Sequence, residues 1–384
     1  MSNEGPWRVG VLFSTSGVTS IIEKSQLKGT MLAIDEINAR GGVRGRPIDP
    51  VCYNPRSVDA RYGELAEQLI REDRINVIFG CYMSSSRKEV LPIVERRNAL
   101  FFYPTLYEGF EYSPNVMYGG ATPNQNSVPL GNHLMETYGR RIYFVGSDYV
   151  YPRESNRVMR HVIRQGGGDV VGEEYLPLQT DPATFEGVVD RILEAKPDAI
   201  FSTVVGQGCI NLYRAYHKAG GHGLTRPIAS LTTNEAEIEQ IGRAAAEGHI
   251  TAAPYFRNLK SAANRRFLAS YHAKYNSTSD VTSCCEAAYS QMHLFAQALE
   301  EVGEMDPDAL RVSLLGTTFA APQGKITVDA ENNHTYLHAL IARVDDQGEF
   351  IIAHKVRRSI KPDPYLVYPA VNDWKFRTQK VRSS

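Results

Sequence analysis

Hydroxyl and tyrosine side chains follow two successive apolar runs in the first third of the chain. The run 77–80 leads into Tyr82 and Ser84, and the run that ends at Tyr103 leads into Thr105. Ligands of open α/β sheets bind beyond the carboxyl ends of the strands, so these four side chains are expected to meet at one edge of a sheet. Hydroxyls and the N–H groups at a helix start can bind an oxygen atom of a ligand. The pattern favours a small-molecule site; the alternative is an ordinary strand–helix–strand unit with a serine cap and packed tyrosines.

The segment between the two apolar runs is predicted to be a helix. Residues 84–86 are three serines, which are good N-cap candidates, and residues 88–97 carry an apolar stripe with the helical period. Both flanking runs are apolar throughout, which is typical of buried strands in a parallel sheet. The sequence therefore predicts a β-α-β unit that positions the hydroxyl and tyrosine side chains.

The second half of the chain repeats this chemistry. Residues 143–152 read YFVGSDYVYP, which predicts a buried strand followed by a polar turn with Tyr149 and Tyr151. Two further predicted strand ends, residues 201–206 and 230–234, could each supply one wall residue. For these two ends the competing interpretation, plain strand-to-helix capping, is favoured.

The predicted lining consists of hydroxyls, aromatic rings and backbone amides, without an obvious charge. Glu154, Glu235 and Glu286 lie near the site segments, but we expect them to be solvated on helix surfaces. A neutral lining suits a small neutral polar ligand, because burying an unpaired charge is costly. The bulky tyrosine rings predict a stiff, narrow space for a ligand the size of acetamide or urea.

Catalytic and metal-binding patterns are missing from the sequence. It contains no G-x-S-x-G elbow, P-loop, H-E-x-x-H motif or clear Rossmann fingerprint. Cys81 would need a nearby base to act as a nucleophile, and none of the ten histidines lies in a predicted strand-end loop. No C-x-x-C pair suggests zinc. We therefore expect a protein that is not an enzyme and that uses no metal and no cofactor.

The composition indicates a globular protein with balanced charge. Of the 384 residues, 42% are hydrophobic and 22% are charged, and 43 acidic residues balance 42 basic ones. The balance gives no excess of positive charge that would favour binding to nucleic acid or to an anionic membrane. No apolar run is long enough to span a bilayer. We therefore expect neither nucleic acid nor membrane as a direct partner.

The cysteines and the N-terminal residues predict the compartment. The five cysteines have no regular spacing, which favours free, mostly buried thiols in a reducing environment. The first predicted strand begins at Arg8, which leaves no room for a signal peptide. We expect a cytoplasmic protein, and the alternative is a periplasmic one whose export signal has been removed.

Apolar periodicity predicts two α/β series followed by a different C-terminal part. The first series has strands at 8–13, 47–53, 77–80 and 100–103 and helices at 21–39, 60–71 and 88–97. The second has helices at 128–137, 155–165, 183–195 and 208–219 and strands at 141–146, 169–175, 199–202 and 227–230. Helices at 262–275, 282–302 and 307–315 come next. Strands at 324–328, 336–343 and 350–355 then suggest an antiparallel appendage.

The length of the chain and a break in the alternation of its helices and strands predict two lobes. At 384 residues the chain is long for one core, and the Gly- and Pro-containing loop 108–123 interrupts the α/β alternation. We expect an N-terminal lobe of residues 1–121 plus 254–330 and a C-terminal lobe of residues 122–253 plus 331–384. The predicted fold class is α/β, with two doubly wound parallel-sheet lobes joined by three crossings and a ligand cleft between them.

Seven groups of motifs support a specific resemblance. In chain order they are GCYMS at 80–84 with SRK at 86–88, YPT at 103–105 with YEGFEYSPN at 107–115, PNQN at 123–126, GSDY at 146–149 with YPRESN at 151–156, EAAY at 286–289, APQG at 321–324 and PDPY at 362–365. With these motifs, which run through nearly the whole chain, the sequence resembles type I periplasmic-binding-protein folds of the branched-chain amino-acid receptor kind. It is most similar to their short-chain amide and urea branch, and within it to AmiC-type amide sensors.

The resemblance implies a clamshell fold, a ligand and a protein partner. Amide sensors of this branch are cytoplasmic negative regulators of amidase operons, which bind an RNA-binding antitermination regulator and release it when a short amide occupies the cleft. Exported urea and amide receptors of ABC transporters are the nearest rival, and a homo-oligomer is compatible with either. The ligand contacts of the branch map by motif to Tyr82, Ser84, Tyr103, Thr105, Tyr149, Tyr151, Val205 and Thr232.

Overall fold

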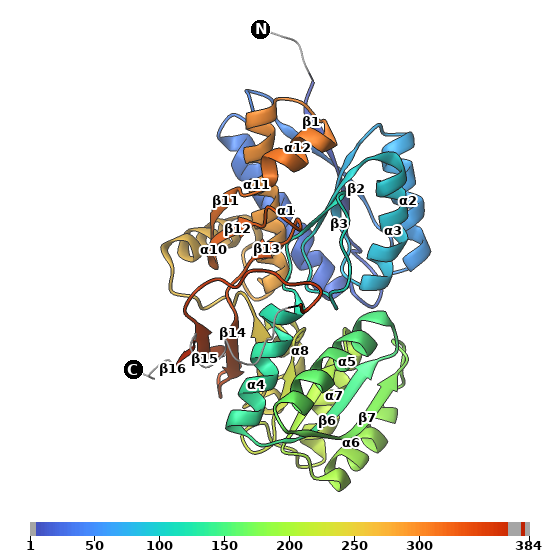
Figure 1. Cartoon of the computed structure of the whole chain (residues 1–384), viewed down its shortest axis with the longest axis vertical. Coiled ribbons are helices and arrows are strands. Elements are labelled where there is room, and N and C mark those ends of the chain that lie inside the picture. The colour runs from blue at the N-terminus through green and yellow to red at the C-terminus, as the bar shows by residue number, and fades with distance from the viewer. Residues whose placement is uncertain (1–4, 368–377, 381–384) are drawn as a thin grey trace. The chain divides into compact units, whose positions relative to one another are not determined.

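The computed structural model describes residues 5–367 and 378–380, and it divides the chain into two compact units (Figure 1). The first unit comprises Met1–Leu106, Glu111–Gly120 and Leu259–Tyr336. The second comprises Tyr107–Phe110, Ala121–Asn258 and Leu337–Ser384. Each unit therefore draws on segments that are far apart in the sequence.

The first unit is built on a parallel five-stranded sheet with the order β2-β1-β3-β4-β5. Its strands are β1 (Trp7–Leu12), β2 (Ile48–Tyr53), β3 (Val77–Gly80), β4 (Leu100–Tyr103) and β5 (Val116–Tyr118). The two middle strands, β3 and β4, are buried along their whole length, which explains why both read as continuous apolar runs. Aromatic rings reinforce this pairing, since Phe79 and Phe102 stack at 4.4 Å.

Helices cover both faces of this sheet (Figure 1). They are α1 (Ser20–Ala39), α2 (Asp59–Arg71), α3 (Ser84–Arg97), α10 (Ala262–Tyr275), α11 (Ser283–Val302) and α12 (Pro307–Leu314). Right-handed crossovers place α1 on one face, where it packs along α11, and the neighbouring α2 and α3 on the other. Gly29 permits the close approach of α1 to α11, because a Cβ there would lie 2.3 Å from the carbonyl oxygen of Cys285.

The second unit contains an eight-stranded sheet with the order β16-β15-β14-β10-β9-β8-β6-β7. Its parallel part comprises β6 (Arg141–Ser147), β7 (Asp169–Leu176), β8 (Ala199–Thr203), β9 (Ile228–Ser230) and β10 (Ile250–Ala253). The antiparallel part comprises β14 (Leu340–Val344), β15 (Phe350–Val356) and β16 (Thr378–Lys380).

Helices of the second unit pack on one another in two groups. The 3-10 turn η1 (Pro123–Gln125), α4 (Ser127–Thr137) and α5 (Val150–Gln165) form one group. The other consists of α6 (Thr184–Ala195), α7 (Gln207–Lys218), α8 (Glu235–Ile241) and α9 (Arg243–Ala246). The parallel strands of both units follow the same order, in which the first strand lies between the second and the third. This order creates a topological switch point in each unit, at the carboxyl ends of β1 and β3 and of β6 and β8.

The predicted α/β fold class with two parallel-sheet lobes is confirmed. The expected antiparallel appendage at the C-terminus is wrong as a single element. The strand at 324–328 is β12 (Gly324–Val328), which pairs with β11 (Thr318–Ala321) and β13 (Thr335–Tyr336) in the first unit. The strands β14 and β15 instead extend the main sheet of the second unit. An antiparallel strand has the same apolar alternation in either sheet, so the sequence pattern does not distinguish the two pairings.

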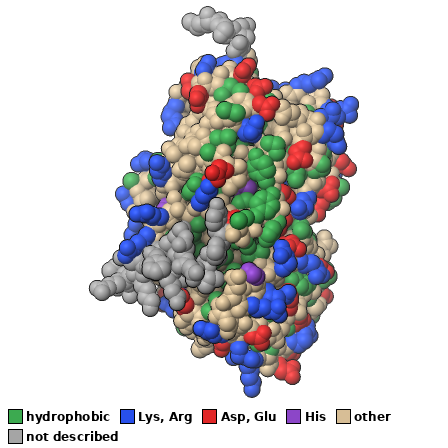
Figure 2. Space-filling view, viewed as in Figure 1, with side chains coloured by type: hydrophobic (Ala, Val, Ile, Leu, Met, Phe, Trp, Pro, Cys, Tyr) green, Lys and Arg blue, Asp and Glu red, His purple; other side chains and the backbone are tan. Residues whose placement is uncertain are grey.

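The surface and the thiols agree with the composition. Figure 2 shows basic and acidic side chains interspersed over the face in view, without a large patch of one sign. All five cysteines are free, and only Cys52 is exposed, so the prediction of free, mostly buried thiols is confirmed. Within the described ranges no helix is long and apolar enough to cross a membrane.

Candidate functional site

The loop after β3 is shaped by close packing of the sheet. Gly80 ends the strand, and a Cβ at this position would lie 2.5 Å from the carbonyl oxygen of Leu12 in the neighbouring strand β1. The N–H of Cys81 donates to the same carbonyl oxygen at 3.0 Å, and Cys81 turns the chain with a φ of 66°. This left-handed turn leads directly from the switch point into Tyr82 and the start of α3.

Ser84 is the first residue of α3, and the N-cap is Met83. The expectation of a serine N-cap is therefore wrong by one position. The backbone of Met83 is extended, and Ser86 Oγ donates back to the carbonyl oxygen of Met83 at 2.8 Å. No side chain at the N-cap accepts from the first N–H groups, which leaves the positive end of the α3 dipole directed at the strand-end edge.

The structure brings the four predicted residues of the first unit together at this edge. The Tyr103 hydroxyl, at the end of β4, donates to the carbonyl oxygen of Tyr82 at 2.7 Å. Thr105 Oγ1 accepts from Gln26 Nε2 of α1 at 2.8 Å. Tyr82, Ser84, Tyr103 and Thr105 are all at most 5% exposed. The hydroxyls of Tyr103 and Thr105 are thus positioned by hydrogen bonds to the loop after β3 and from α1.

A buried ion pair lies directly behind these hydroxyls, which corrects the expectation of an uncharged site. Arg87 is fully buried and donates through Nε to Glu111 Oε1 at 2.8 Å and through Nη2 to Oε2 at 3.2 Å. Its Nη1 donates to Ser84 Oγ at 3.2 Å, and its guanidinium lies 4.9 Å from the ring centre of Tyr103. Burial raises the pKa of the Glu111 carboxyl, but the charges of Arg87 and Lys88 outweigh it and hold this pKa below its usual value.

A second buried carboxyl lies at the carboxyl end of β1. Glu23 of α1 accepts from the N–H of Ser14 at 2.8 Å and from the Tyr62 hydroxyl at 2.7 Å, and Thr19 Oγ1 also donates to it. Burial raises the pKa of Glu23 to about 7. Sequence reasoning missed Glu23, because a carboxylate on an amphipathic helix is usually solvated. It also missed Arg87, although Arg87 lies three residues after Ser84 and therefore on the same helix face.

Cys81 does not have the properties of a nucleophile. Its side chain is fully buried, and burial, together with the nearby charge of Glu23, raises the pKa of the thiol well above its usual value. The thiolate is the reactive form, so this environment disfavours nucleophilic chemistry. Within the described residues no group of three or more histidine, cysteine, aspartate or glutamate side chains could hold a metal ion.

In the second unit the helix after β6 begins earlier than predicted. We expected a polar turn up to Ser155, whereas α5 starts at Val150 with Tyr149 as its N-cap. Pro152 is compatible with this start, because proline is tolerated in the first turn of a helix. Tyr149 is half-buried and Tyr151 is buried, and their ring centres lie 6.3 Å apart. The two tyrosines thus stand together at the switch point of the second unit.

Val205 and Thr232 follow β8 and β9 and are held by serines of the sheet. The N–H of Val205 donates to Ser147 Oγ at 3.2 Å, and the N–H of Thr232 donates to Ser230 Oγ at 3.0 Å. Strand-to-helix capping, the favoured interpretation of these two strand ends, is confirmed, because Gly206 and Asn234 are the N-caps of the helices that follow, α7 and α8. Val205 and Thr232 themselves cap no helix.

Two of the three carboxylates expected to be solvated are buried. Glu235 is 7% exposed and accepts from the N–H of Arg257 at 2.8 Å, and Glu286 is fully buried and accepts from Gln323 Nε2 at 2.7 Å. Burial raises the pKa of each to about 7. Only Glu154 is solvated, and it pairs with Arg157 on the surface of α5. Helix periodicity alone could not separate these cases, because the covering segments come from distant parts of the chain.

Four buried carboxyls predict a decline in stability at mildly alkaline pH. Burial raises the pKa of Glu23, Glu235 and Glu286 to about 7 and that of Glu237 to about 8. In the unfolded chain these groups release their protons near pH ~4.3. Between this pH and their folded-state pKa values the folded state binds more protons than the unfolded state, so the free energy of unfolding falls as pH rises. We expect the melting temperature to fall between pH ~6.5 and ~8. His249 and His334, whose folded-state pKa values burial lowers to about 3 and about 4, oppose this fall only at its lower end, because unfolded histidines release their protons near pH ~6.5.

The variant Glu237→Gln should flatten this pH profile, and differential scanning calorimetry across the interval would measure it. Glu154→Gln, at a partly exposed position, is the matched control and should leave the slope unchanged. A wild-type melting temperature that is constant or rises from pH ~6.5 to ~8 would contradict the prediction.

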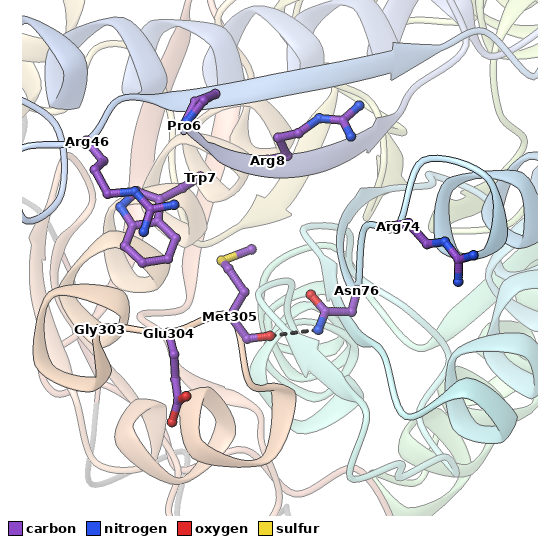
Figure 3. A pocket seen from close by; sticks show the side chains of 9 residues that line it. All are labelled: Pro6, Trp7, Arg8, Arg46, Arg74, Asn76, Gly303, Glu304 and Met305. Carbon is purple, nitrogen blue, oxygen red and sulfur yellow. Dashed lines mark hydrogen bonds between the residues drawn. The ribbon is translucent and has the colours of Figure 1, made fainter. Parts of the chain in front are cut away.

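A separate hollow lies at the opposite end of the first sheet (Figure 3). Its volume is about 350 Å³, and its walls include Trp7, Arg8, Asn76 and Met305. Asn76 Nδ2 donates to the carbonyl oxygen of Met305 at 2.7 Å. The hollow lies at the amino ends of the strands, whereas ligands of open α/β sheets bind at the carboxyl ends. It is therefore not the candidate site.

Comparison with known proteins identifies the family. The model of the periplasmic binding protein domain matches residues 7–370. The chain belongs to the periplasmic binding protein family. Its two units, each with a doubly wound parallel sheet, are those of the type I fold of this family.

Individual relatives agree with this assignment. The chain is 23% identical over 352 residues to the Leu/Ile/Val-binding protein homolog 6 of Brucella melitensis, covering 88% of each chain. A solute binding protein of an ABC transporter from Rhodopseudomonas palustris, solved with 3,4-dihydroxybenzoic acid, is similar in fold, with a TM-score of 0.84, 22% identity and 93% and 99% of the two chains covered. The branched-chain amino acid binding protein of Streptococcus pneumoniae, solved with isoleucine, has a TM-score of 0.79 at 19% identity, covering 90% and 99%.

Proposed function

We propose that this periplasmic binding protein family member is a sensor of short-chain aliphatic amides. In this proposal it holds an RNA-binding antitermination regulator and releases it when an amide binds, and so represses amidase expression until substrate is present. The observation that carries the proposal is the edge of the first sheet, where Tyr82, Ser84, Tyr103 and Thr105 lie together beside the uncapped start of α3. The motif resemblance to amide sensors includes these residues.

The chemistry of this edge suits a primary amide. The carbonyl oxygen of an amide accepts hydrogen bonds, and the start of α3 and the Ser84 hydroxyl provide donors for it. The amide –NH₂ group donates two hydrogen bonds, and hydroxyl oxygens such as Thr105 Oγ1 can accept them. The proposal also includes Tyr149, Tyr151, Val205 and Thr232, at the strand ends of the second unit, as ligand-binding residues.

A signal requires that the ligand favours one conformation of the protein. An amide that bound the regulator-holding and the regulator-releasing states equally would change nothing, however tightly it bound. Size-exclusion chromatography of the protein mixed with a candidate antitermination regulator from the same host would test this step. The complex should persist without ligand and dissociate with acetamide; a complex that is indifferent to amides would contradict the sensor proposal.

The second candidate is a transport receptor for urea or a short amide. It is favoured by the similarity to the Rhodopseudomonas palustris solute binding protein of an ABC transporter. The two candidates differ in compartment, because the sensor is proposed to be cytoplasmic and the receptor to be exported. Fractionation of the native host, with an antibody against this protein, separates them: a periplasmic protein would eliminate the sensor.

Hydrolysis of the amide is the third possibility, and it is simple to test. Buried Cys81, with its raised pKa, offers no activated nucleophile. Incubation of the purified protein with acetamide should release no ammonia beyond the rate in buffer. Catalytic turnover in that assay would replace the binding proposal by an enzymatic one.

Ser84→Ala is expected to weaken amide binding by about 1–2 kcal/mol, the usual cost of removing one hydrogen-bond partner in a buried site. The reason is the position of Ser84 at the start of α3, where its hydroxyl is oriented by Arg87. Isothermal titration calorimetry with acetamide measures the effect. Ser313→Ala on α12, where the serine donates to Glu301, is the matched control and should bind like wild type. Unchanged affinity in a folded Ser84→Ala protein would remove Ser84 from the site.

A further inference from the structure

The first-unit edge has a charge arrangement that bears on which ligands it accepts. The positive end of the α3 dipole and the Arg87 guanidinium both lie next to Ser84. These two features alone would favour an anion, such as a carboxylate. Relatives of this fold are known with carboxylate ligands, namely isoleucine and dihydroxybenzoic acid.

Glu111 offsets this positive field. Its carboxylate makes two hydrogen bonds to Arg87, at 2.8 and 3.2 Å, and it accepts from the Tyr118 hydroxyl at 3.0 Å. Arg87 is fully buried and Glu111 is 8% exposed, so solvent screens their fields only weakly. The carboxylate is therefore separated from the Ser84 hydroxyl by one guanidinium group.

Other groups around the same loop add little positive charge. Lys88 contacts Glu111 at 3.1 Å, but its side chain is 46% exposed and is screened by water. The charges of Glu23 on α1, Asp59 on α2 and Arg87 on α3 all influence the pKa of the Cys81 thiol, so they lie near the same loop. Next to Tyr118, His334 stacks at 4.1 Å, and its burial keeps it neutral at physiological pH.

We propose that Glu111 determines the charge selectivity of the ligand site, by neutralising Arg87 so that a neutral carbonyl group binds in preference to a carboxylate. The inference rests on the proposed function, because it concerns the same site. Glu111 does not need to touch the ligand. It acts through Arg87, which positions Ser84 and determines the local potential, and so it is a specificity-determining residue.

The test compares acetamide with acetate, two ligands of nearly equal size that differ in charge. Isothermal titration calorimetry measures both dissociation constants for wild type, Glu111→Gln and Lys88→Met. Wild type should prefer acetamide. Glu111→Gln removes the carboxylate charge that pairs with Arg87 and should shift the ratio of affinities toward acetate by about tenfold or more.

Lys88→Met removes a positive charge from the exposed side of the Arg87–Glu111 pair. It should shift the ratio of affinities slightly toward acetamide. This variant keeps the test decisive if Glu111→Gln is poorly folded, because an exposed lysine is not needed for stability. Lys218→Met in the second unit, an exposed lysine paired with Glu186, controls for a general change of surface charge and should leave the ratio unchanged.

The outcomes separate the two proposals. If wild type binds acetamide but Glu111→Gln and Lys88→Met keep the wild-type ratio, charge selectivity by Glu111 is wrong and amide binding stands. A wild-type protein that prefers acetate would also overturn the inference, although it would still support a ligand-binding site at this edge of the sheet. If wild type binds neither ligand, the amide proposal itself fails, and the inference fails with it.

Discussion

Replacement of Arg87 by methionine is expected to lower the free energy of unfolding by about 3–5 kcal/mol. Arg87 is fully buried and forms two hydrogen bonds with Glu111, so the variant leaves a buried carboxylate without its main counter-charge. Lys88 would still contact Glu111 from its exposed side, which places the expected loss toward the lower end of this range. Urea denaturation, with the slope checked for two-state behaviour, measures the change.

A double variant identifies the cause. In Arg87→Met with Glu111→Leu both charges are gone, and most of the lost stability should return, because an apolar pair of similar volume often replaces a buried ion pair without cost. Lys218→Met is the matched control, since Lys218 and Glu186 pair at 2.7 Å on the exposed surface. The control should hardly change the stability. Equal losses in Arg87→Met and in the control would show that the buried pair has no special role.

Ligand affinity is expected to fall steeply once an amide exceeds the optimal length by one or two carbons. Each added methylene first gains about 0.8 kcal/mol of apolar burial. When the space is full, overpacking costs about 1–3 kcal/mol, because aromatic walls have few rotatable bonds and cannot easily yield. Calorimetric titration of a homologous series from acetamide to hexanamide measures the profile. A flat profile out to hexanamide would show that the tyrosine rings do not limit ligand size.

The structure decides which tyrosine to trim in such a series. Tyr103→Ala, the obvious choice from the sequence, would remove a fully buried ring at the end of β4 that lies under Arg87, and it would destabilise the protein by about 3–5 kcal/mol. Tyr149 is half-buried at the N-cap of α5, so Tyr149→Ala should shift the preferred amide toward longer chains while the fold remains intact. Tyr103→Phe retains the ring and tests the hydroxyl that donates to Tyr82.

The sequence by itself determined the elements that carry the site. The runs 77–80 and 100–103 are apolar at every position, because both strands are buried on both faces of a parallel sheet, and the structure places β3 and β4 there. Since carboxyl ends of parallel strands share one edge, the meeting of Tyr82 and Ser84 with Tyr103 and Thr105 followed from local pattern alone. Motif spacing then indicated the family.

Tertiary structure alone decided where the charges lie. Arg87 and Glu111 are 24 residues apart, and nothing in the local pattern pairs a helix arginine with a glutamate in a Gly- and Pro-containing loop. Glu235 and Glu286 were expected to be solvated, yet the structure buries both, and it also buries Glu23, which the sequence pattern did not single out. Burial of a polar side chain depends on what covers it, and the covering segments come from distant parts of the chain. The spacing of hydrophobic residues shows which face of a helix or strand is buried. It does not show which distant segment packs on that face, because this depends on the whole fold.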